Sequence, residues 1–136
     1  MAGLSISSIL FYLVNLGVAL FGVLYTFSPK IMPYHEEFLG RKFEELEPKV
    51  AQLLLALLRV AGVAFFSAAI GLVVIITGPY RDGAPWALWT VSLMLLVPLV
   101  PLVFFSWRLG PMTPWRLILG MVVLVVIAAA LGLAGL

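Results

Sequence analysis

The chain has 136 residues, of which 64% are hydrophobic, only 10% are charged and none is cysteine. A soluble domain carries about 25% charged residues, so this composition excludes a water-soluble fold. Without cysteine, the chain has no disulfide, thiolate metal site or iron–sulfur cluster. Its formal net charge of +2 comes from basic residues scattered at predicted helix ends, which indicates membrane anchoring and no nucleic-acid binding.

Four stretches of the sequence carry no charge and are long enough to cross a bilayer. They cover residues 1–29, 60–80, 83–107 and 117–136. A helix of about 20 apolar residues spans the hydrocarbon core. The sequence therefore predicts an all-α membrane protein, a four-helix transmembrane bundle that forms a single domain over residues 1–136. The predicted spans are 4–27, 48–77, 86–107 and 115–135.

Prolines and tryptophans mark the ends of these spans. The first span ends before Pro29, because the residue that precedes a proline resists helix formation. Pro48 suits the first position of the second span, which ends before Pro79. Pro98 and Pro101 lie within the third span and predict a kink, since each removes a backbone donor. Amphipathic indole rings favour the membrane interface, and all four tryptophans stand at span ends: Trp86, Trp89, Trp107 and Trp115.

The polar part of the chain lies between Lys30 and Lys49, which holds nine of the 14 charged residues and the only histidine. Within it, residues 34–47 have the pattern of an amphipathic helix. Charged side chains (Glu37, Arg41, Glu44 and Glu45) occupy one side of the helical wheel, and apolar ones share the other. We expect this helix to lie at the membrane surface between the first two spans. Its apolar side consists of Phe38, Leu39, Phe43 and Leu46.

Basic residues are unequally divided between the two sides of the predicted bundle. Six lie in the loops that join spans one to two and spans three to four, whereas Arg81 stands alone on the other side. The positive-inside rule then places those two loops in the cytoplasm and both termini outside.

Arg59 is the only charged side chain well inside a predicted span. Asn15 lies about as many residues before the first loop as Arg59 lies after it, so the two are expected at a similar depth in the membrane. On each of the two spans, small or polar residues form a stripe that includes Asn15 or Arg59. We expect the stripes to face each other or a shared cavity. An intramembrane arginine indicates a functional site, here one that binds a lipid head group, a carboxylate or a phosphate. The residues predicted to line this site are Arg59, Asn15, Gln52 and Tyr12.

A structural role for Arg59 is the alternative. Its side chain would then snorkel towards the surface, or bond to Asn15 and to helix carbonyls as a packing device. Direct catalysis is disfavoured, because a guanidinium group does not titrate near neutral pH and acts only by stabilising charge.

His35 and Glu36 belong to a second predicted polar cluster, together with Glu44 and Glu45. A single histidine beside acidic residues lacks the i,i+4 spacing of a helical zinc pair, so no metal site is predicted. His35 would suit a general base oriented by Glu36, but no nucleophile is evident and no catalytic residue is assigned. On the wheel His35 falls on the apolar side, which favours an interfacial or packed role.

Two further patterns bear on the class of protein. The spacings Ser67-x-x-x-Gly71 and Ala128-x-x-x-Gly132 are typical of helix contacts or dimerisation. No Asp or Glu lies within a predicted span, which disfavours a proton-coupled transporter of the carboxylate-relay type. No cofactor is predicted.

Four short motifs carry a resemblance. They are Met32-Pro33-Tyr34-His35-Glu36, Leu57-Leu58-Arg59-Val60-Ala61-Gly62, Trp86-Ala87-x-Trp89 and Thr113-Pro114-Trp115. In this layout the chain resembles small four-helix bacterial membrane proteins that have no known activity. The resemblance implies a four-helix fold in the bacterial cytoplasmic membrane, and it implies no site residue.

Three functions follow in order of preference. The first is a non-enzymatic membrane component, which forms a homo-oligomer or serves as an accessory subunit of a larger membrane complex. The second is a binder or carrier of a small molecule, an anion or a lipid, with its cavity around Arg59 and Asn15. The third is a lipid-modifying enzyme that works at the interface through His35 and Glu36. Membrane lipids are the expected partners in each case.

Overall fold

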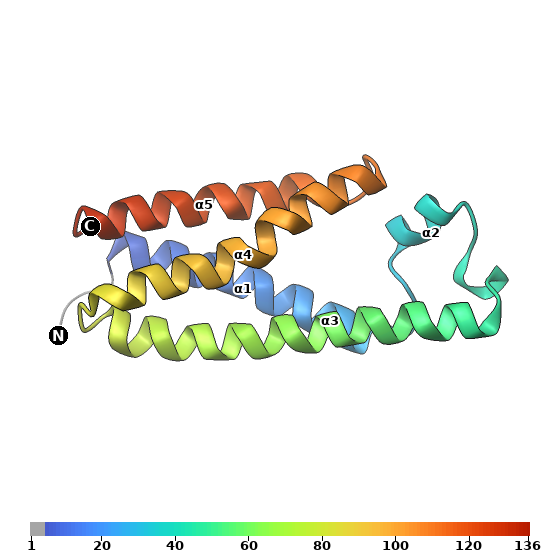
Figure 1. Cartoon of the computed structure of the whole chain (residues 1–136), viewed down its shortest axis with the longest axis horizontal. Coiled ribbons are helices and arrows are strands. Elements are labelled where there is room, and N and C mark those ends of the chain that lie inside the picture. The colour runs from blue at the N-terminus through green and yellow to red at the C-terminus, as the bar shows by residue number, and fades with distance from the viewer. Residues whose placement is uncertain (1–4) are drawn as a thin grey trace.

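The computed structural model describes residues 5–136, and helices dominate it (Figure 1). Four helices have the length and apolar composition to cross a membrane. They are α1 (Ile6–Phe27), α3 (Pro48–Ile75), α4 (Pro85–Leu109) and α5 (Trp115–Leu133). A π-helical turn, η2 (Ile76–Tyr80), extends α3 through Pro79, so the prediction that the second span ends before Pro79 is wrong. The predicted all-α bundle with four membrane spans is confirmed, and the chain is an integral membrane protein.

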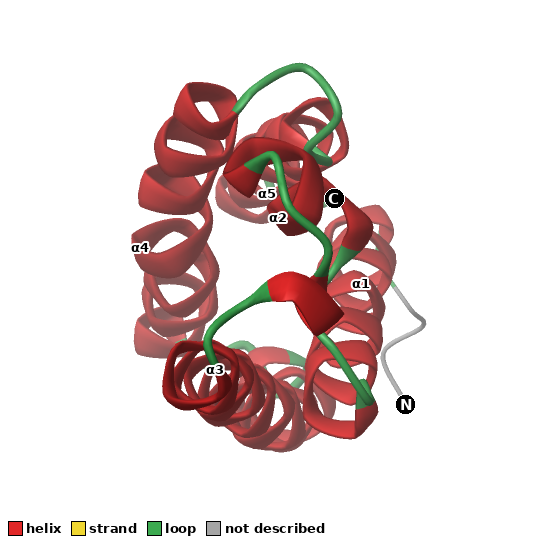
Figure 2. Cartoon of the chain, turned by 90° about the vertical axis from the view of Figure 1, so that its right-hand side faces the viewer, coloured by secondary structure: helices red, strands yellow, loops and turns green. Residues whose placement is uncertain are grey.

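Helix α1 packs against both α3 and α5, while α4 forms a hairpin with α5 (Figures 1 and 2). α3 and α4 touch less extensively. Helix α1 begins and α5 ends at the same end of the bundle, which we call the terminal end, and the opposite end is the loop end (Figure 1). The core contains buried side chains from all four spans, among them Phe11, Val14, Leu72, Leu95, Ile118 and Val125.

Local sequence accounts for where the helices begin and bend. Ser5 caps α1, because its hydroxyl accepts a hydrogen bond from a backbone N–H of the first turn. Pro48 and Pro85 open α3 and α4, at a position where the missing N–H leaves no helical bond unmade. Helix α4 continues through Pro98 and Pro101, which account for its bend part-way along (Figure 1).

The predicted amphipathic helix over residues 34–47 is wrong in its length. Helix α2 covers only Pro33–Leu39 and ends at Gly40, whose φ of 62° is the left-handed conformation of a glycine helix cap. A short 3₁₀ turn, η1 (Phe43–Glu45), follows. The interfacial segment between α1 and α3 is therefore two short helical pieces joined at a glycine, and the single long apolar face is lost.

Helix α3 extends beyond the loop end of α1. The guanidinium of Arg59 donates to the backbone carbonyl of Ser28, the residue that directly follows α1, at 3.2 Å. The 11 residues of α3 that precede Arg59 therefore lie past the end of α1. Helix α2 lies beside this extension (Figure 1), and Ile31, just before α2, is buried.

Candidate functional site

The polar and small residues of α1 meet α3 along a close interface. A Cβ atom added at Gly62 would lie 2.5 Å from the backbone nitrogen of Thr26, and one added at Gly22 would lie 2.7 Å from that of Phe66. The side-chain amide of Asn15 donates to the carbonyl oxygen of Ala69 at 3.0 Å. Glycine thus brings the two backbones together, as small residues do in membrane helices.

The prediction that Arg59 and Asn15 lie at the same depth is wrong. Asn15 is opposite Ala69, whereas Arg59 is opposite Ser28. Ten residues of α3 separate Arg59 from Ala69, which is about 15 Å along a helix. The prediction assumed that α1 ends and α3 begins at the same depth. In the structure α3 begins 11 residues before Arg59, which is the residue that lies beside the end of α1. The two side chains therefore do not line a shared cavity.

The other residues predicted for that cavity are also apart. Gln52 is exposed on the part of α3 that lies beyond α1. Tyr12 is half-buried and packs against the apolar core. Asn15 is buried, and its Oδ1 atom has no hydrogen-bond partner. Backbone carbonyls accept the hydrogen bonds of both Asn15 and Arg59, so these two side chains act as links between helices.

Glu36 organises the interfacial segment. Its carboxylate accepts a hydrogen bond from the backbone N–H of Phe43 at 3.0 Å and pairs with Lys30 at 3.3 Å. The hydrogen bond from Phe43, followed by the charge of Lys30, lowers the pKa of Glu36. Glu44 also pairs with Lys30, at 3.6 Å. Glu45 accepts from the backbone N–H of Lys42 at 3.2 Å. These acids hold the turns between α2 and α3.

Among the described residues, no hydrogen bond or ion pair joins His35 to these acids. It lines an apolar groove between α2 and α3, and burial lowers its pKa. Its ring stands edge-on to that of Tyr34, with the ring centroids 4.4 Å apart. The groove is lined by Ile31, His35, Phe38, Leu39, Leu54, Leu57 and Leu58. The role of His35 here is packing, in line with its place on the apolar side of the wheel.

A larger apolar cavity lies between α1 and α5. No pattern in the sequence predicts it. We call it the α1–α5 wedge, and its volume is about 590 Å³. Its α1 wall repeats at helical spacing and consists of Leu13, Val14, Gly17, Leu20, Phe21, Leu24 and Tyr25. The remaining lining residues are Met32, Tyr34, Pro114, Leu117, Met121 and Leu124.

The wedge is closed towards the terminal end of the bundle. There α1 and α5 touch through the buried Ser7 hydroxyl, which donates to the carbonyl oxygen of Ala128 at 2.6 Å. A Cβ atom added at Gly132 would lie 3.0 Å from the same hydroxyl oxygen. The two helices therefore separate only in the half that faces the loop end.

Two tyrosines stand at the loop end of the wedge. The hydroxyl oxygens of Tyr25, on α1, and Tyr34, on α2, are 2.5 Å apart and share a hydrogen bond. The ring of Tyr25 is held between Phe21 and Phe65, at centroid distances of 5.8 and 6.4 Å. Tyr34 reaches the wedge because Pro33 begins α2 directly before it. Burial raises the pKa of Tyr34, so its hydroxyl keeps its proton.

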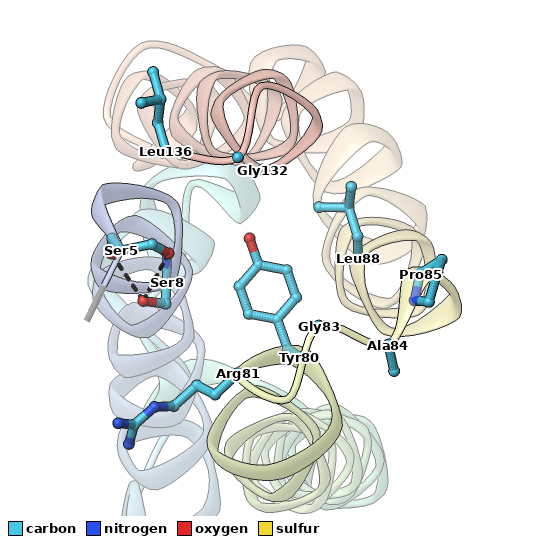
Figure 3. A pocket seen from close by; sticks show the side chains of 11 residues that line it. Ser5, Ser8, Tyr80, Arg81, Gly83, Ala84, Pro85, Leu88, Gly132 and Leu136 are labelled. Atoms are coloured by element: carbon cyan, nitrogen blue, oxygen red, sulfur yellow. Dashed lines mark hydrogen bonds between the residues drawn. The ribbon is translucent and has the colours of Figure 1, made fainter. Parts of the chain in front are cut away.

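A smaller pocket of about 280 Å³ lies at the terminal end (Figure 3). Tyr80 points into the space between α1, α4 and α5. Its hydroxyl lies 2.5 Å from that of Ser7 and is the donor, because the Ser7 proton is given to Ala128. The serines at the start of α1 hint at a polar contact at this end of the bundle. The sequence does not show that Tyr80 is their partner, so it does not predict the pocket.

Ser7, Asn15 and Tyr80 therefore join helices to one another, whereas Thr26, Thr90 and Ser92 bond within their own helices. The wedge is the largest of the apolar spaces described above. No protein-family model, curated protein or solved structure matches this chain.

Proposed function

We propose that the protein is a non-enzymatic membrane component that binds the acyl chain of a lipid in the α1–α5 wedge. The observation that carries this proposal is the shape of the wedge: an apolar space open at the loop half of two membrane spans and closed at the terminal half by the contact of Ser7 with Ala128.

The length of the wedge fits one leaflet. From Leu13 to Tyr25 the α1 wall covers 12 residue steps, which is about 18 Å along a helix. Half of a hydrocarbon core of about 30 Å is about 15 Å. A partner helix that crosses the membrane would need a groove along the whole span, so the wedge suits a lipid chain better. Its volume also falls within the range of about 300–1,000 Å³ that is usual for ligand pockets.

The proposal includes the orientation of the bundle in the membrane. The positive-inside rule puts the loop end in the cytoplasm, so the wedge would take lipid from the inner leaflet of a bacterial cytoplasmic membrane. Because the chain has no native cysteine, the single-cysteine variants Lys42→Cys and Asp82→Cys allow a direct test. A membrane-impermeant maleimide should label Asp82→Cys on intact cells and Lys42→Cys only after permeabilisation. The reverse pattern would contradict this orientation.

Photo-crosslinking tests lipid binding in the wedge. The full chain is placed in nanodiscs that contain phosphatidylcholine with a diazirine in one acyl chain, and the labelled residues are mapped by mass spectrometry. We expect adducts to concentrate on the wedge walls. The variant Leu20→Trp fills the wedge and should reduce those adducts several-fold.

A matched control is available on α4. Leu93 is as exposed as Leu20 (both 56%) but does not line the wedge, so Leu93→Trp should leave the adducts on the wedge walls unchanged. Adducts spread evenly over the lipid-facing surfaces, with no effect of Leu20→Trp, would contradict the proposal.

Self-association, or assembly with another membrane chain, is the second candidate. The observation that favours it is on α3. There the Ser67 side chain is exposed and has no hydrogen bond to the described residues, and a Cβ atom at Gly71 would meet nothing within 4 Å. The similar Ala128–Gly132 spacing is instead used inside the bundle, against Ser7. Native mass spectrometry should show a dimer or a fixed complex that Ser67→Leu dissociates. A monomer in mild detergent would count against this candidate.

A further inference from the structure

Building on the proposed acyl-chain binding, we infer that the wedge is selective for a neutral amphiphile, whose polar head offers an oxygen acceptor to the hydroxyl pair of Tyr25 and Tyr34. The structure supports this through the position of the pair, the hydrogen it leaves available, and the charges around it.

The position of the pair makes it the contact for a polar head. Both tyrosines line the wedge, and they stand at its loop end, nearest the charged residues of the interfacial segment. A chain that runs along α1 towards Leu13 would place its polar end beside the two hydroxyls. The rest of the α1 wall, from Leu13 to Leu24, is apolar.

The pair has one hydrogen to give. Two tyrosine hydroxyls carry two protons, and the 2.5 Å hydrogen bond between them uses one. The second proton has no acceptor within the described part of the chain. An ester, ketone, amide or quinone carbonyl of a bound amphiphile would accept it, and a hydroxyl head would also serve. Both rings are held in place by aromatic neighbours, so the donor is positioned before the ligand enters.

The charges around the pair favour a neutral head. Among the described residues that line the wedge, none is charged. The basic groups near this end of the wedge already have partners. Lys30 pairs with Glu36 and Glu44, and Arg59 donates to Ser28. Arg116 lies over the ring of Trp115, 5.3 Å from its centroid. An anionic head at this position would lose water without meeting a cation on the wedge wall, and a cationic head would find no carboxylate there. Both are costly in an apolar setting.

Four probes with the same chain and different heads test the inference. They are 1-oleoylglycerol, which is neutral, oleate and oleoyl lysophosphatidate, which are anionic, and oleylamine, which is cationic. Retention of each by the full-length protein is measured by native mass spectrometry from one detergent. We expect retention of 1-oleoylglycerol to exceed that of each charged probe about tenfold.

Tyrosine variants locate the selectivity. The double variant Tyr25→Phe/Tyr34→Phe removes both hydroxyls and keeps both rings, so the affinity for 1-oleoylglycerol should fall about two- to tenfold, the effect of losing one hydrogen bond. Either single change leaves one hydroxyl proton to donate and should cost less. Binding of oleate should not change. Tyr12→Phe is the matched control on α1, because Tyr12 does not line the wedge, and it should leave every probe unaffected. Thermal unfolding of each variant verifies that it is folded.

The outcomes separate this inference from the function on which it rests. If 1-oleoylglycerol and the charged probes are retained equally, and Leu20→Trp abolishes them all, the wedge binds chains but the selectivity for a neutral head is refuted. If the double variant Tyr25→Phe/Tyr34→Phe leaves retention of 1-oleoylglycerol unchanged, the role of the hydroxyl pair is refuted. If no probe is retained, or Leu20→Trp changes nothing, both proposals are refuted.

Discussion

The side-chain amide of Asn15 on α1 donates a hydrogen bond to the backbone carbonyl of Ala69 on α3 at 3.0 Å. This contact sets the register of the two helices, because it joins the middle of α1 to the terminal half of α3. Gly22 and Gly62 bring the same pair of backbones together nearer the loop end. The contact therefore leaves Arg59 nearly three turns of α3 nearer the loop end, at the level of Ser28.

The register predicts that Asn15 and Arg59 act independently. In a double-mutant cycle with Asn15→Leu and Arg59→Leu, we expect the changes in unfolding free energy to add within about 0.5 kcal/mol, as for residues far apart. Each single change should cost about 1 kcal/mol or less, since hydrogen bonds between membrane helices contribute about 0.6 kcal/mol on average. Unfolding in mixed micelles measures both. A coupling well above 0.5 kcal/mol would place the two side chains in contact.

Gly62→Ala should destabilise the bundle, because the added methyl group would overlap the backbone of Thr26. Overpacking of this kind costs about 1–3 kcal/mol. Gly71→Ala is the matched control on the same helix, since its methyl group would meet nothing within 4 Å. Thermal unfolding of the two variants in one detergent compares them. Equal stabilities would contradict the close contact of Gly62 with the backbone of Thr26.

Tyr80→Phe should loosen the terminal end. The change removes the donor to Ser7, whose own hydroxyl bridges to Ala128, and should cost about 0.5–1.5 kcal/mol. Tyr12→Phe serves as the comparison, because the Tyr12 hydroxyl makes no hydrogen bond in the described part of the chain. Unfolding free energies of the two variants give the measurement, and a cost no larger for Tyr80→Phe would rule out this bridge.

The interfacial segment should loosen as the pH falls. Burial lowers the pKa of His35 below its ordinary 6.5, so the folded segment resists a proton that the unfolded one accepts, and stability begins to decline below that pH. The pKa of Glu36 is lowered from 4.5, so its contribution is present above pH 4.5 and is lost as the pH falls further. Both effects have the same sign.

A spin label reports this loosening. Placed at Glu37→Cys, an exposed site on α2 in a chain with no other cysteine, it should become more mobile below about pH 6.5 and again below about pH 4.5. His35→Phe should remove the first step, and Glu36→Gln should make the segment mobile at neutral pH. A label whose mobility is the same from pH 8 to pH 4 would contradict the account of both residues.

The apolar composition and the positions of the charges and prolines were enough to determine the four spans of this protein. A bilayer demands about 20 apolar residues for each crossing, and the chain has four such runs, separated by its charges and prolines. Helices α3 and α5 accordingly begin at Pro48 and Trp115, where they were predicted. The end of α2 was also readable in principle, since Gly40 is a natural helix cap. The amphipathic pattern continues across this glycine to residue 47 and so predicts a helix that is too long.

Only the tertiary structure decided which faces of the spans meet. In a soluble protein an apolar stripe marks the buried side of a helix, but in a membrane the lipid-facing side is apolar too. The sequence therefore does not distinguish Leu20, which lines the wedge, from Leu93, which does not. The register of α1 on α3 depended on how far α3 runs past α1, which the length of the loop does not reveal. The wedge depends on the separation of α1 from α5, and the meeting of Tyr25 with Tyr34 depends on the fold of the segment between them.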